Sequence, residues 1–277
     1  MTRGYVTEMF SSFQGEGPYA GRRQVFLRFA GCPLSCFYCD TAYAREPRPK
    51  FCNLLRPDKK TRKRNPLSAS EVLDCVKALL SPDLHSVCYT GGEPLTPSSA
   101  GFVKEIANAV KETGLRNFLE TSGCSARAFA SLADCFDFAS VDIKLRGHQA
   151  VQGEDSYEAL YRNELECVRI AVERGVETVV KVVVVKGTPA AEIEEICRDL
   201  SGFEFGLGGR ERDREGRGRE GRGREKGRVK FVLQPVTAPR SGAVPSTEEL
   251  FELSEVAGRF LRDVAVIPQV HKFLGVL

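Results

Sequence analysis

Apolar and polar positions along the chain follow two different periods. Short apolar runs bounded by polar residues or glycine predict buried strands at 25–30, 86–89, 117–120, 138–144, 178–185 and 230–236. Between them, apolar side chains recur at helical spacing over 72–80, 98–113, 157–174, 193–200 and 246–263. Ser70 is the expected N-cap of the first of these helices. Strands that alternate with helices predict an α/β fold with parallel strands and right-handed crossovers.

Polar side chains gather where these strands end. They follow successive strands at Thr90, Glu93, Glu120, Asp142, Lys144 and Gln234. Parallel α/β folds place their active sites at the carboxyl ends of the strands, and packing alone does not explain such repeated placement. The pattern therefore predicts a functional site at that edge of the sheet.

Charge is concentrated in two segments. The net charge of the chain is +3. Residues 45–64 carry nine Lys or Arg and two acids, and residues 206–228 carry nine Lys or Arg and five acids. The two segments are thus strongly positive, and the rest of the chain carries a net charge of −8. We expect a solvated basic loop at 45–66 and a disordered Gly/Arg/Glu insertion at 206–228, since the latter has almost no apolar side chain. Phe51 is the sole aromatic residue of the first segment, so nucleic-acid binding is not expected there.

Length and hydropathy indicate one domain spanning residues 1–277. The chain has 277 residues, within the range of one α/β barrel, and its 42% hydrophobic content suffices for a full core. It has no apolar window long enough for a membrane span and no apolar N-terminal signal segment. A cytoplasmic protein whose ten cysteines are mostly thiols is expected.

The most specific chemical signal is a C-x3-C-x2-C spacing formed by Cys32, Cys36 and Cys39. One short loop can thereby offer three thiolates to one metal centre, and thiolates are the ligands of iron–sulfur clusters. A four-iron cluster held by three cysteines leaves one iron open for chemistry. A structural zinc site normally has four ligands, and Cys52, the nearest later cysteine, has no partner at two-residue spacing. Zinc and ordinary core cysteines remain the alternatives.

Two features before this loop point to a ligand. Gly15 and Gly17 bracket a polar turn where the backbone can approach a bound molecule, although an ordinary strand–turn entry has the same pattern. Arg28 interrupts the apolar run at 25–30, and a buried arginine needs a partner. A substrate carboxylate would satisfy it with two parallel hydrogen bonds, and an acidic neighbour at the strand edge is the alternative.

The cysteine spacing resembles that of the radical S-adenosylmethionine (SAM) superfamily. The resemblance implies a partial, modified (β/α) barrel with parallel strands and one 4Fe–4S cluster on Cys32, Cys36 and Cys39. It also implies that SAM binds the open iron and is cleaved reductively to a 5′-deoxyadenosyl radical. No side-chain acid or base is then expected to carry the central chemistry.

Further segments narrow the resemblance to one family. They are Phe13-Gln-Gly-Glu-Gly17, Asp40-Thr41, Thr90-Gly-Gly-Glu-Pro94, Asp142-Ile-Lys144, Leu233-Gln-Pro235 and Pro268-Gln-Val-His-Lys272. Together they resemble the 7-carboxy-7-deazaguanine synthases of the queuosine and archaeosine routes, over nearly the whole chain apart from the two basic segments. The family converts 6-carboxy-5,6,7,8-tetrahydropterin to 7-carboxy-7-deazaguanine with release of ammonia and regeneration of SAM. The resemblance also implies Mg²⁺, an electron donor such as flavodoxin or ferredoxin, and a homodimer.

Residue roles follow from this resemblance position by position. It implies SAM contacts at Tyr38, Cys39, Asp40, Gly92, Asp142, Ile143, Lys144 and Gln234, and substrate contacts at Phe13, Gln14, Gly15, Arg28 and Thr90. Thr41 matches the magnesium ligand, and a hydroxyl oxygen suits that hard cation. Structural roles remain open for Gly92 as a tight turn, Thr41 as a turn hydroxyl and His271 as a C-terminal packing residue.

One departure and two competing functions remain. Ser122 stands where the family usually has Asn, which leaves the contacts of that loop open. A glycyl-radical enzyme activase shares the cysteine loop, but the Phe13–Gly17 turn argues against it. An RNA-binding protein with a structural metal would show neither iron–sulfur absorption nor SAM cleavage.

Overall fold

The computed structural model describes residues 2–56, 58–206, 229–237 and 243–276. Its strands are β1 (Arg3–Gly4), β2 (Val6–Phe13), β3 (Arg23–Phe29), β4 (Phe51–Leu55), β5 (Lys60–Arg64), β6 (Leu67–Ser68), β7 (Ser86–Gly91), β8 (Asn117–Thr121), β9 (Phe138–Ile143), β10 (Glu177–Val184), β11 (Val229–Pro235) and β12 (Val264–Val266). Its α-helices are α1 (Ala69–Lys77), α2 (Ala100–Glu112), α3 (Ala126–Ala130), α4 (Glu154–Glu173), α5 (Ala190–Gly206), α6 (Thr247–Gly258) and α7 (Val270–Leu274). No helix in these ranges is long and apolar enough to cross a membrane.

One curved sheet of ten strands organises the molecule. Its order is β12-β11-β10-β9-β8-β7-β3-β2-β4-β5, and neighbours run parallel from β3 through β12. The two end strands, β5 and β12, do not pair with each other, so the barrel is partial as predicted. Strand β10 has five valines among its eight residues and is buried at all but its first residue, because layers cover both faces of a central parallel strand.

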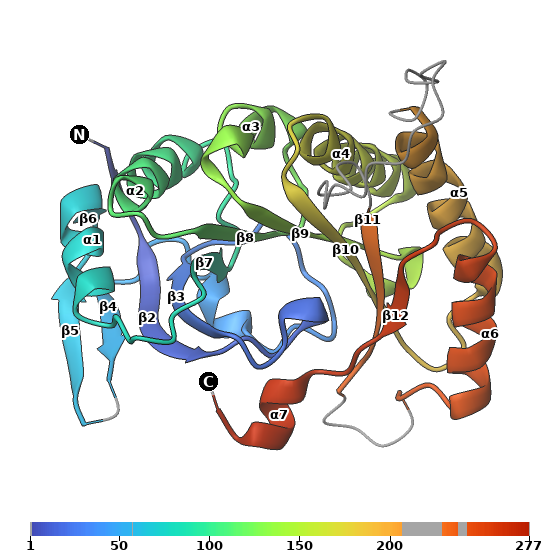
Figure 1. The fold of residues 1–277 in the computed structure, drawn as a ribbon, viewed down its shortest axis with the longest axis horizontal. Helices are drawn as coiled ribbons and strands as arrows, with labels where there is room; N and C mark the ends of the chain where they lie inside the picture. Colours follow the sequence, from blue (N-terminus) through green and yellow to red (C-terminus); the bar gives the residue numbers. More distant parts are fainter. Residues whose placement is uncertain (1, 57, 207–228, 238–242, 277) are drawn as a thin grey trace, which may run out of the picture.

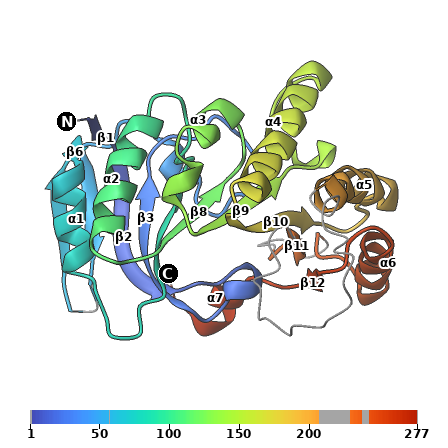
Figure 2. The ribbon, with the colours of Figure 1, turned by 45° about the horizontal axis from the view of Figure 1, so that its top comes forward.

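Helices cover the outer, convex side of this sheet. Figure 1 shows α1 to α6 following one another around the outside, while α7 and the C-terminus lie across the opposite, concave side; Figure 2 shows the same arrangement from an inclined view. The main apolar core joins helix residues, such as Phe102 and Ile106 of α2, to outward-facing strand residues, such as Leu119 of β8. A smaller aromatic cluster around Phe10, Phe26 and Phe118 fills the concave side.

Strand β2, the first strand of the ten-stranded sheet along the chain, departs from the predicted parallel pattern. Strand β2 runs antiparallel to β3, with Glu8 opposite Arg28 and Phe10 opposite Phe26. A short hairpin-like return between the two strands is sufficient for this pairing, whereas a parallel pair needs a long crossover. The prediction of parallel strands therefore holds for β3 and β7 to β12, and it is wrong for the pairing of β2 with β3.

The predicted basic loop at 45–66 is also wrong in its inner part. Residues 51–64 form the antiparallel hairpin β4–β5, and β4 adds to the sheet parallel to β2. Cys52 and Leu54 are buried in the main core, so alternate residues of this charged segment anchor it as a strand. The predicted disordered insertion at 206–228 lies outside the described residues, apart from its first residue at the end of α5.

The first helix begins earlier than predicted. Ser68, not Ser70, is the N-cap: its side chain accepts from the Glu71 backbone N–H, and the Glu71 carboxylate accepts from Ser68 N at 2.8 Å. This reciprocal capping box satisfies two otherwise unpaired donors. The short elements α3, β12 and α7 were not predicted, since runs of three to five residues carry little periodic signal.

Candidate functional site

The site is a cavity of about 410 Å³ at the carboxyl ends of the parallel strands. Its wall combines the cysteine loop, the inner face of β2 and β3, the ends of β7 to β11, and the C-terminal segment. Every predicted site residue lines this cavity except Ile143, whose side chain is buried in the main core. The sheet topology thus brings together residues from separate strand ends, as the strand-end pattern predicted.

Backbone contacts hold the cysteine loop against the segment that follows β9. Ser35 N donates to Ala150 O at 2.9 Å, and Phe37 N donates to His148 O at 3.3 Å. Arg45, in the segment that follows the cysteine loop, donates from Nη2 to Cys36 O at 2.9 Å. These bonds fix the direction of the loop relative to the segment that follows β9.

The three thiols suit an iron–sulfur cluster by their chemistry and surroundings. Cys32, Cys36 and Cys39 all line the cavity, and they pack around a small apolar cluster with Leu34. Burial raises the pKa of Cys32 to about 11 and raises that of Cys36, against the opposing charge of Lys144. Among the described residues no three Cys, His, Asp or Glu surround a single ion position, which is compatible with a cluster because each thiolate there binds a different iron.

His148, which had no assigned role from sequence, joins this loop to the sheet. Its Nδ1 accepts from Leu145 N at 2.9 Å and lies 3.2 Å from the Tyr38 hydroxyl, while Nε2 lies 2.9 Å from Val183 O. Because Nδ1 accepts, Nε2 carries the proton in a neutral ring. Burial, together with the nearby Lys144 charge, lowers the pKa of His148 to about 3, so the ring stays neutral at physiological pH.

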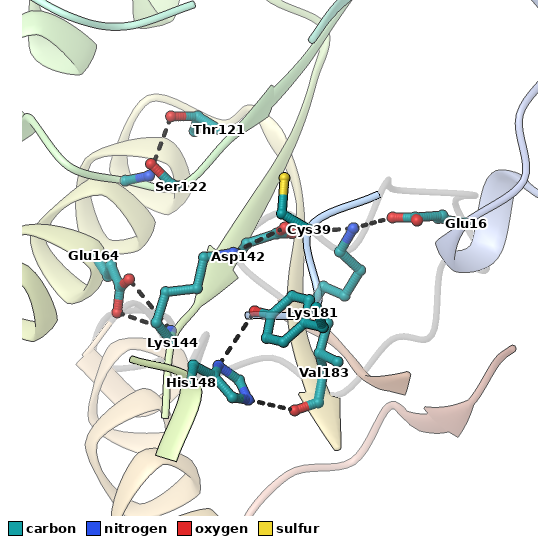
Figure 3. A network of polar contacts seen from close by, with 12 residues as sticks. Glu16, Cys39, Thr121, Ser122, Asp142, Lys144, His148, Glu164, Lys181 and Val183 are labelled. Atoms are coloured by element: carbon teal, nitrogen blue, oxygen red, sulfur yellow. Dashed lines mark hydrogen bonds and ion pairs between the residues drawn. The ribbon is translucent and has the colours of Figure 1, made fainter. Parts of the chain in front are cut away.

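Alternating charges form a buried chain along one wall, drawn in Figure 3. Asp142 lies between two lysines, with 3.2 Å from Oδ2 to Lys144 Nζ and 3.2 Å from Oδ1 to Lys181 Nζ. Lys181 also pairs with Glu16, which accepts from Gln269 Nε2 at 2.7 Å. Burial alone would raise the pKa of Glu16, but Lys181, Gln269 and His271 outweigh it and hold the value at about 2.

A second buried carboxylate, Glu93, ties β7 to β8. One of its oxygens accepts from Leu95 N at 2.8 Å and from the Thr121 hydroxyl at 2.7 Å. The other accepts from the backbone N–H of Ser122 at 2.7 Å and from the Ser122 hydroxyl. The serine that departs from the family pattern therefore holds this loop with a side-chain hydrogen bond of its own.

Arg28 has the acidic neighbour that one of the two interpretations from sequence expected, and its pairing with a substrate carboxylate stays a prediction. Its Nε donates to Glu8 Oε1 at 2.8 Å, so it has an acidic neighbour across the β2–β3 pair. The guanidinium also lines the cavity, above the ring of Phe10 at 5.6 Å. The Tyr43 hydroxyl donates to the same Glu8 oxygen at 2.7 Å, so Glu8 orients two cavity side chains.

The polar groups of Gln14 are engaged within the protein. Its Nε2 donates to Gln24 at 2.9 Å and to Glu120 at 2.8 Å, while its Oε1 accepts from the backbone N–H groups of Gly15 and Glu16. Gln14 therefore shapes the turn that contacts the cavity. Burial raises the pKa of Glu120, against the charge of Lys181.

Gln234, unlike Gln14, has a polar atom without a partner among the described residues. It is 3% exposed and lines the cavity, and its Oε1 has no hydrogen-bond partner among the described residues. A buried amide oxygen without a partner is costly, so this atom is suited to accept from a bound donor such as an amino or hydroxyl group.

The C-terminal segment closes one side of the cavity. Val270 N donates to Gly15 O at 2.7 Å, and Lys272 Nζ pairs with Asp40 Oδ2 at 3.0 Å. A Cβ on Gly15 would lie 2.1 Å from His271 Nδ1, so glycine is needed at this turn because the histidine packs against it. His271 therefore has the packing role that the sequence left open.

Gly92 is required by the approach of the cysteine loop. A Cβ there would lie 2.1 Å from Gly31 O and 2.8 Å from Ala44 O, and Glu93 N donates to that same Gly31 oxygen at 2.6 Å. We expect Gly92→Ala to push the loop outward and to lower the iron content of reconstituted protein severalfold. Gly101→Ala, which meets only a Thr2 methyl at 3.8 Å, is the matched control. Normal iron content in Gly92→Ala would show that the loop tolerates displacement.

Several cavity residues were not singled out from sequence: Glu8, Glu16, Tyr43, Lys181 and Gln269. Glu93 and Glu120 were named only as strand-end polar residues, with no role of their own. Lys181 had a usable signal, because it is the single charge in a strand otherwise made of Val and Thr after its first residue. Glu16 stood between two glycines of the turn already singled out. Its partner lies 165 residues away, and no local pattern shows such a pairing.

Comparison with known proteins agrees with this geometry. The family model described as the radical SAM superfamily matches residues 27–200. The crystal structure of QueE from Escherichia coli superposes with a TM-score of 0.50 at 18% identity, covering 95% of this chain and 93% of that one, which shows a shared fold. The chain belongs to the radical SAM superfamily.

Sequence relatives define the family within it. The 7-carboxy-7-deazaguanine synthase of Methanocaldococcus jannaschii is 35% identical over 276 residues, covering 98% of this chain and all of the relative. The enzyme of the same name from Methanothermobacter thermautotrophicus is 34% identical over 283 residues, covering 99% and 98%. The chain belongs to the 7-carboxy-7-deazaguanine synthase family.

Proposed function

We propose that this protein converts 6-carboxy-5,6,7,8-tetrahydropterin to 7-carboxy-7-deazaguanine with release of ammonia. The observation that carries the proposal is the cavity, where a three-cysteine loop faces an arginine, a buried carboxylate network and an unpartnered amide oxygen. A radical reaction on a small carboxylated heterocycle needs a cluster site, a cation for the carboxylate and polar groups that orient the ligands, all close together. The activase alternative needs an opening for a protein chain, and nothing in this cavity favours it.

Cys32, Cys36 and Cys39 would hold a 4Fe–4S cluster, and SAM bound beside it would supply the deoxyadenosyl radical. Tyr38, Asp40, Asp142, Lys144 and Gln234 would position SAM. The Gln234 oxygen can accept from a SAM amino or hydroxyl group, while Lys144 and Asp142 form an ion pair on the wall beside the cysteine loop. Gly92 would contribute by letting the cysteine loop approach the sheet.

Phe13, Gln14, Gly15, Arg28 and Thr90 would form the substrate side of the cavity. Gln14 keeps the turn in shape, and Arg28 presents a cation that can pair with the substrate carboxylate beyond its bond to Glu8. We further propose that Thr41 ligates Mg²⁺ there. Its hydroxyl lies 3.7 Å from Cys39 Sγ, and an oxygen ligand suits that cation. A reductant of the flavodoxin or ferredoxin type and a homodimer are part of the same proposal.

The decisive experiment is anaerobic turnover of the reconstituted protein with the carboxytetrahydropterin, SAM and dithionite, followed by mass spectrometry. The expected product is 7-carboxy-7-deazaguanine, with SAM recovered and ammonia released. Stoichiometric loss of SAM without a deazapurine product would contradict the proposal and favour a different radical SAM reaction.

Arg28→Lys tests the substrate side of the cavity. Lysine keeps the charge but cannot make two parallel hydrogen bonds to a carboxylate. Removing a charge-assisted hydrogen bond of this kind costs about 1.5–3 kcal/mol, or roughly one to two decades in affinity. We expect substrate affinity, measured by isothermal titration, to fall by that amount while SAM affinity and iron content change little.

The control for that experiment is Arg23→Lys, a neighbouring arginine on the same strand whose Nε donates to Ser11. It lies outside the cavity wall. An equal loss of SAM affinity in Arg28→Lys, or unchanged substrate affinity, would show that the arginine serves only its pair with Glu8.

A further inference from the structure

The hairpin β4–β5 presents an unusual surface beside the cavity. Residues 48–64 contain eight Lys or Arg and one acidic residue, Asp58. Lys60, Arg62 and Arg64 occupy alternate positions of β5 and are all exposed, and within the described part of the chain none of them forms an ion pair. We call the face formed by Lys60, Arg62, Arg64 and Phe51 the basic face.

Strand register places these cations on one side of the sheet. Arg64 lies opposite Phe51, Arg62 opposite Asn53, and Lys60 opposite Leu55. Cys52 and Leu54 point into the main core, while Leu55 packs against the aromatic cluster of the concave side. Side chains alternate between faces of a strand, so the cations are on the concave side.

The basic face is continuous with the wall of the cavity. Asn53, next to Arg62, lies beside Glu8 of β2, which in turn lies opposite Arg28 of β3. Figure 1 shows β4 and β5 at the open edge of the sheet, with no strand beyond β5 among the described residues. The surface is therefore open to solvent and accessible to a long ligand.

An aromatic ring lies within this line of charges. Phe51 is 38% exposed, with Lys50 Nζ 5.6 Å and the Arg62 guanidinium 6.0 Å from its ring centroid. Cations spaced two residues apart on a strand stand about 7 Å from one another, which suits a regular series of negative charges. An exposed ring and a guanidinium plane are surfaces on which bases stack.

We propose that the basic face binds single-stranded RNA. The phosphate backbone would follow Lys60, Arg62 and Arg64, and a base would stack on Phe51 or on the Arg62 guanidinium. The remainder of the chain outside the two basic segments carries −8, so it repels a polyanion and leaves this face as a favoured contact. The sequence alone did not predict nucleic-acid binding in this segment, because cations in a loop would not share one face. Strand β5 aligns them on one face.

The test measures binding of a labelled mixed-sequence single-stranded RNA to the full chain by fluorescence anisotropy over a range of salt concentrations. The triple variant Lys60→Gln, Arg62→Gln, Arg64→Gln should bind at least about tenfold more weakly at physiological salt. The slope of log K against log salt should become shallower by about 2, because each phosphate that is no longer neutralised accounts for about 0.7. Phe51→Ala should weaken binding by about fivefold or more, because it removes the ring on which a base stacks.

The matched control removes the same charge elsewhere: Lys104→Gln, Lys111→Gln, Arg127→Gln, all exposed on α2 and α3. It should bind RNA like the unmodified chain. Equal reductions of RNA affinity in both triple variants would show that only net charge matters, and would overturn the proposal.

Three further results would also overturn it. One is unchanged RNA affinity in the β5 variant combined with self-association, because lysine on an edge strand also prevents sheet-to-sheet contact. Another is unchanged RNA affinity combined with lower turnover at low pterin concentration, which would mean that the face attracts the anionic substrate. The third is binding to phosphatidylserine vesicles, but not to RNA, that depends on these three cations.

Discussion

Cys36→Ala is expected to abolish both cluster binding and turnover. Two thiolates cannot hold a four-iron cluster with one open iron, because two irons would then lack protein ligands. Cys36 is also the most buried thiol of the loop, at 9% exposure, so no outside ligand replaces it readily. The measurement is iron and sulfide content after anaerobic reconstitution, together with absorption of the iron–sulfur band.

Cys124→Ala is the control for that experiment. Cys124 is half-buried and packs against the same apolar cluster as the loop, but it lies outside the cysteine spacing. It should retain iron and turnover. Full iron content in Cys36→Ala, or an equal loss in Cys124→Ala, would contradict the assignment of the cluster to these three cysteines.

The parts of the fold that could be predicted are those with a local cause. Burial of β10 on both faces requires a run of valines, and parallel pairing requires a helix between strands, so both leave a pattern in the sequence. The placement of Thr90, Asp142 and Gln234 around one cavity followed from the rule that parallel strands end at the same edge. The capping box at Ser68 and Glu71 was equally visible as Ser-x-x-Glu and could have been preferred to Ser70.

The parts that could not be predicted depend on contacts between distant segments. The hairpin β4–β5 is a strand pair because Cys52 and Leu54 reach the core, which a charge count over the segment conceals. Arg28 has a partner in Glu8, twenty residues earlier, only because β2 and β3 are antiparallel. The neutral ring of His148 likewise follows from its burial against Val183, thirty-five residues away.

The largest effect on stability is expected from Lys181→Met. Lys181 is a buried cation between two half-buried carboxylates, Asp142 and Glu16; its side chain is 7% exposed, whereas theirs are 25% and 20% exposed. Removing one partner of a buried ion pair leaves an uncompensated charge and typically costs about 3–5 kcal/mol. Methionine keeps the apolar stem, so the loss should come from charge and not from packing. The free energy of unfolding of the metal-free protein, measured by urea denaturation near neutral pH, should fall by that amount.

The pH dependence of this loss identifies its cause. With Lys181 present, the pKa of Glu16 is about 2, below its ordinary value of 4.5, so its ionised form stabilises the fold above pH 4.5 and this contribution disappears between pH 4.5 and 2. Without Lys181, burial is opposed only by Gln269 and His271, so the pKa of Glu16 should rise and the stabilisation from its ionised form should be largely lost. The difference between the two proteins should therefore be largest near neutral pH and should shrink as the pH falls through 4.5.

Lys230→Met, which breaks a more exposed pair with Glu177 on the neighbouring strand, is the control and should cost no more than about 1 kcal/mol. A loss in Lys181→Met that is equally small, or that does not change with pH, would show that the chain of charges along the cavity wall does not stabilise the fold.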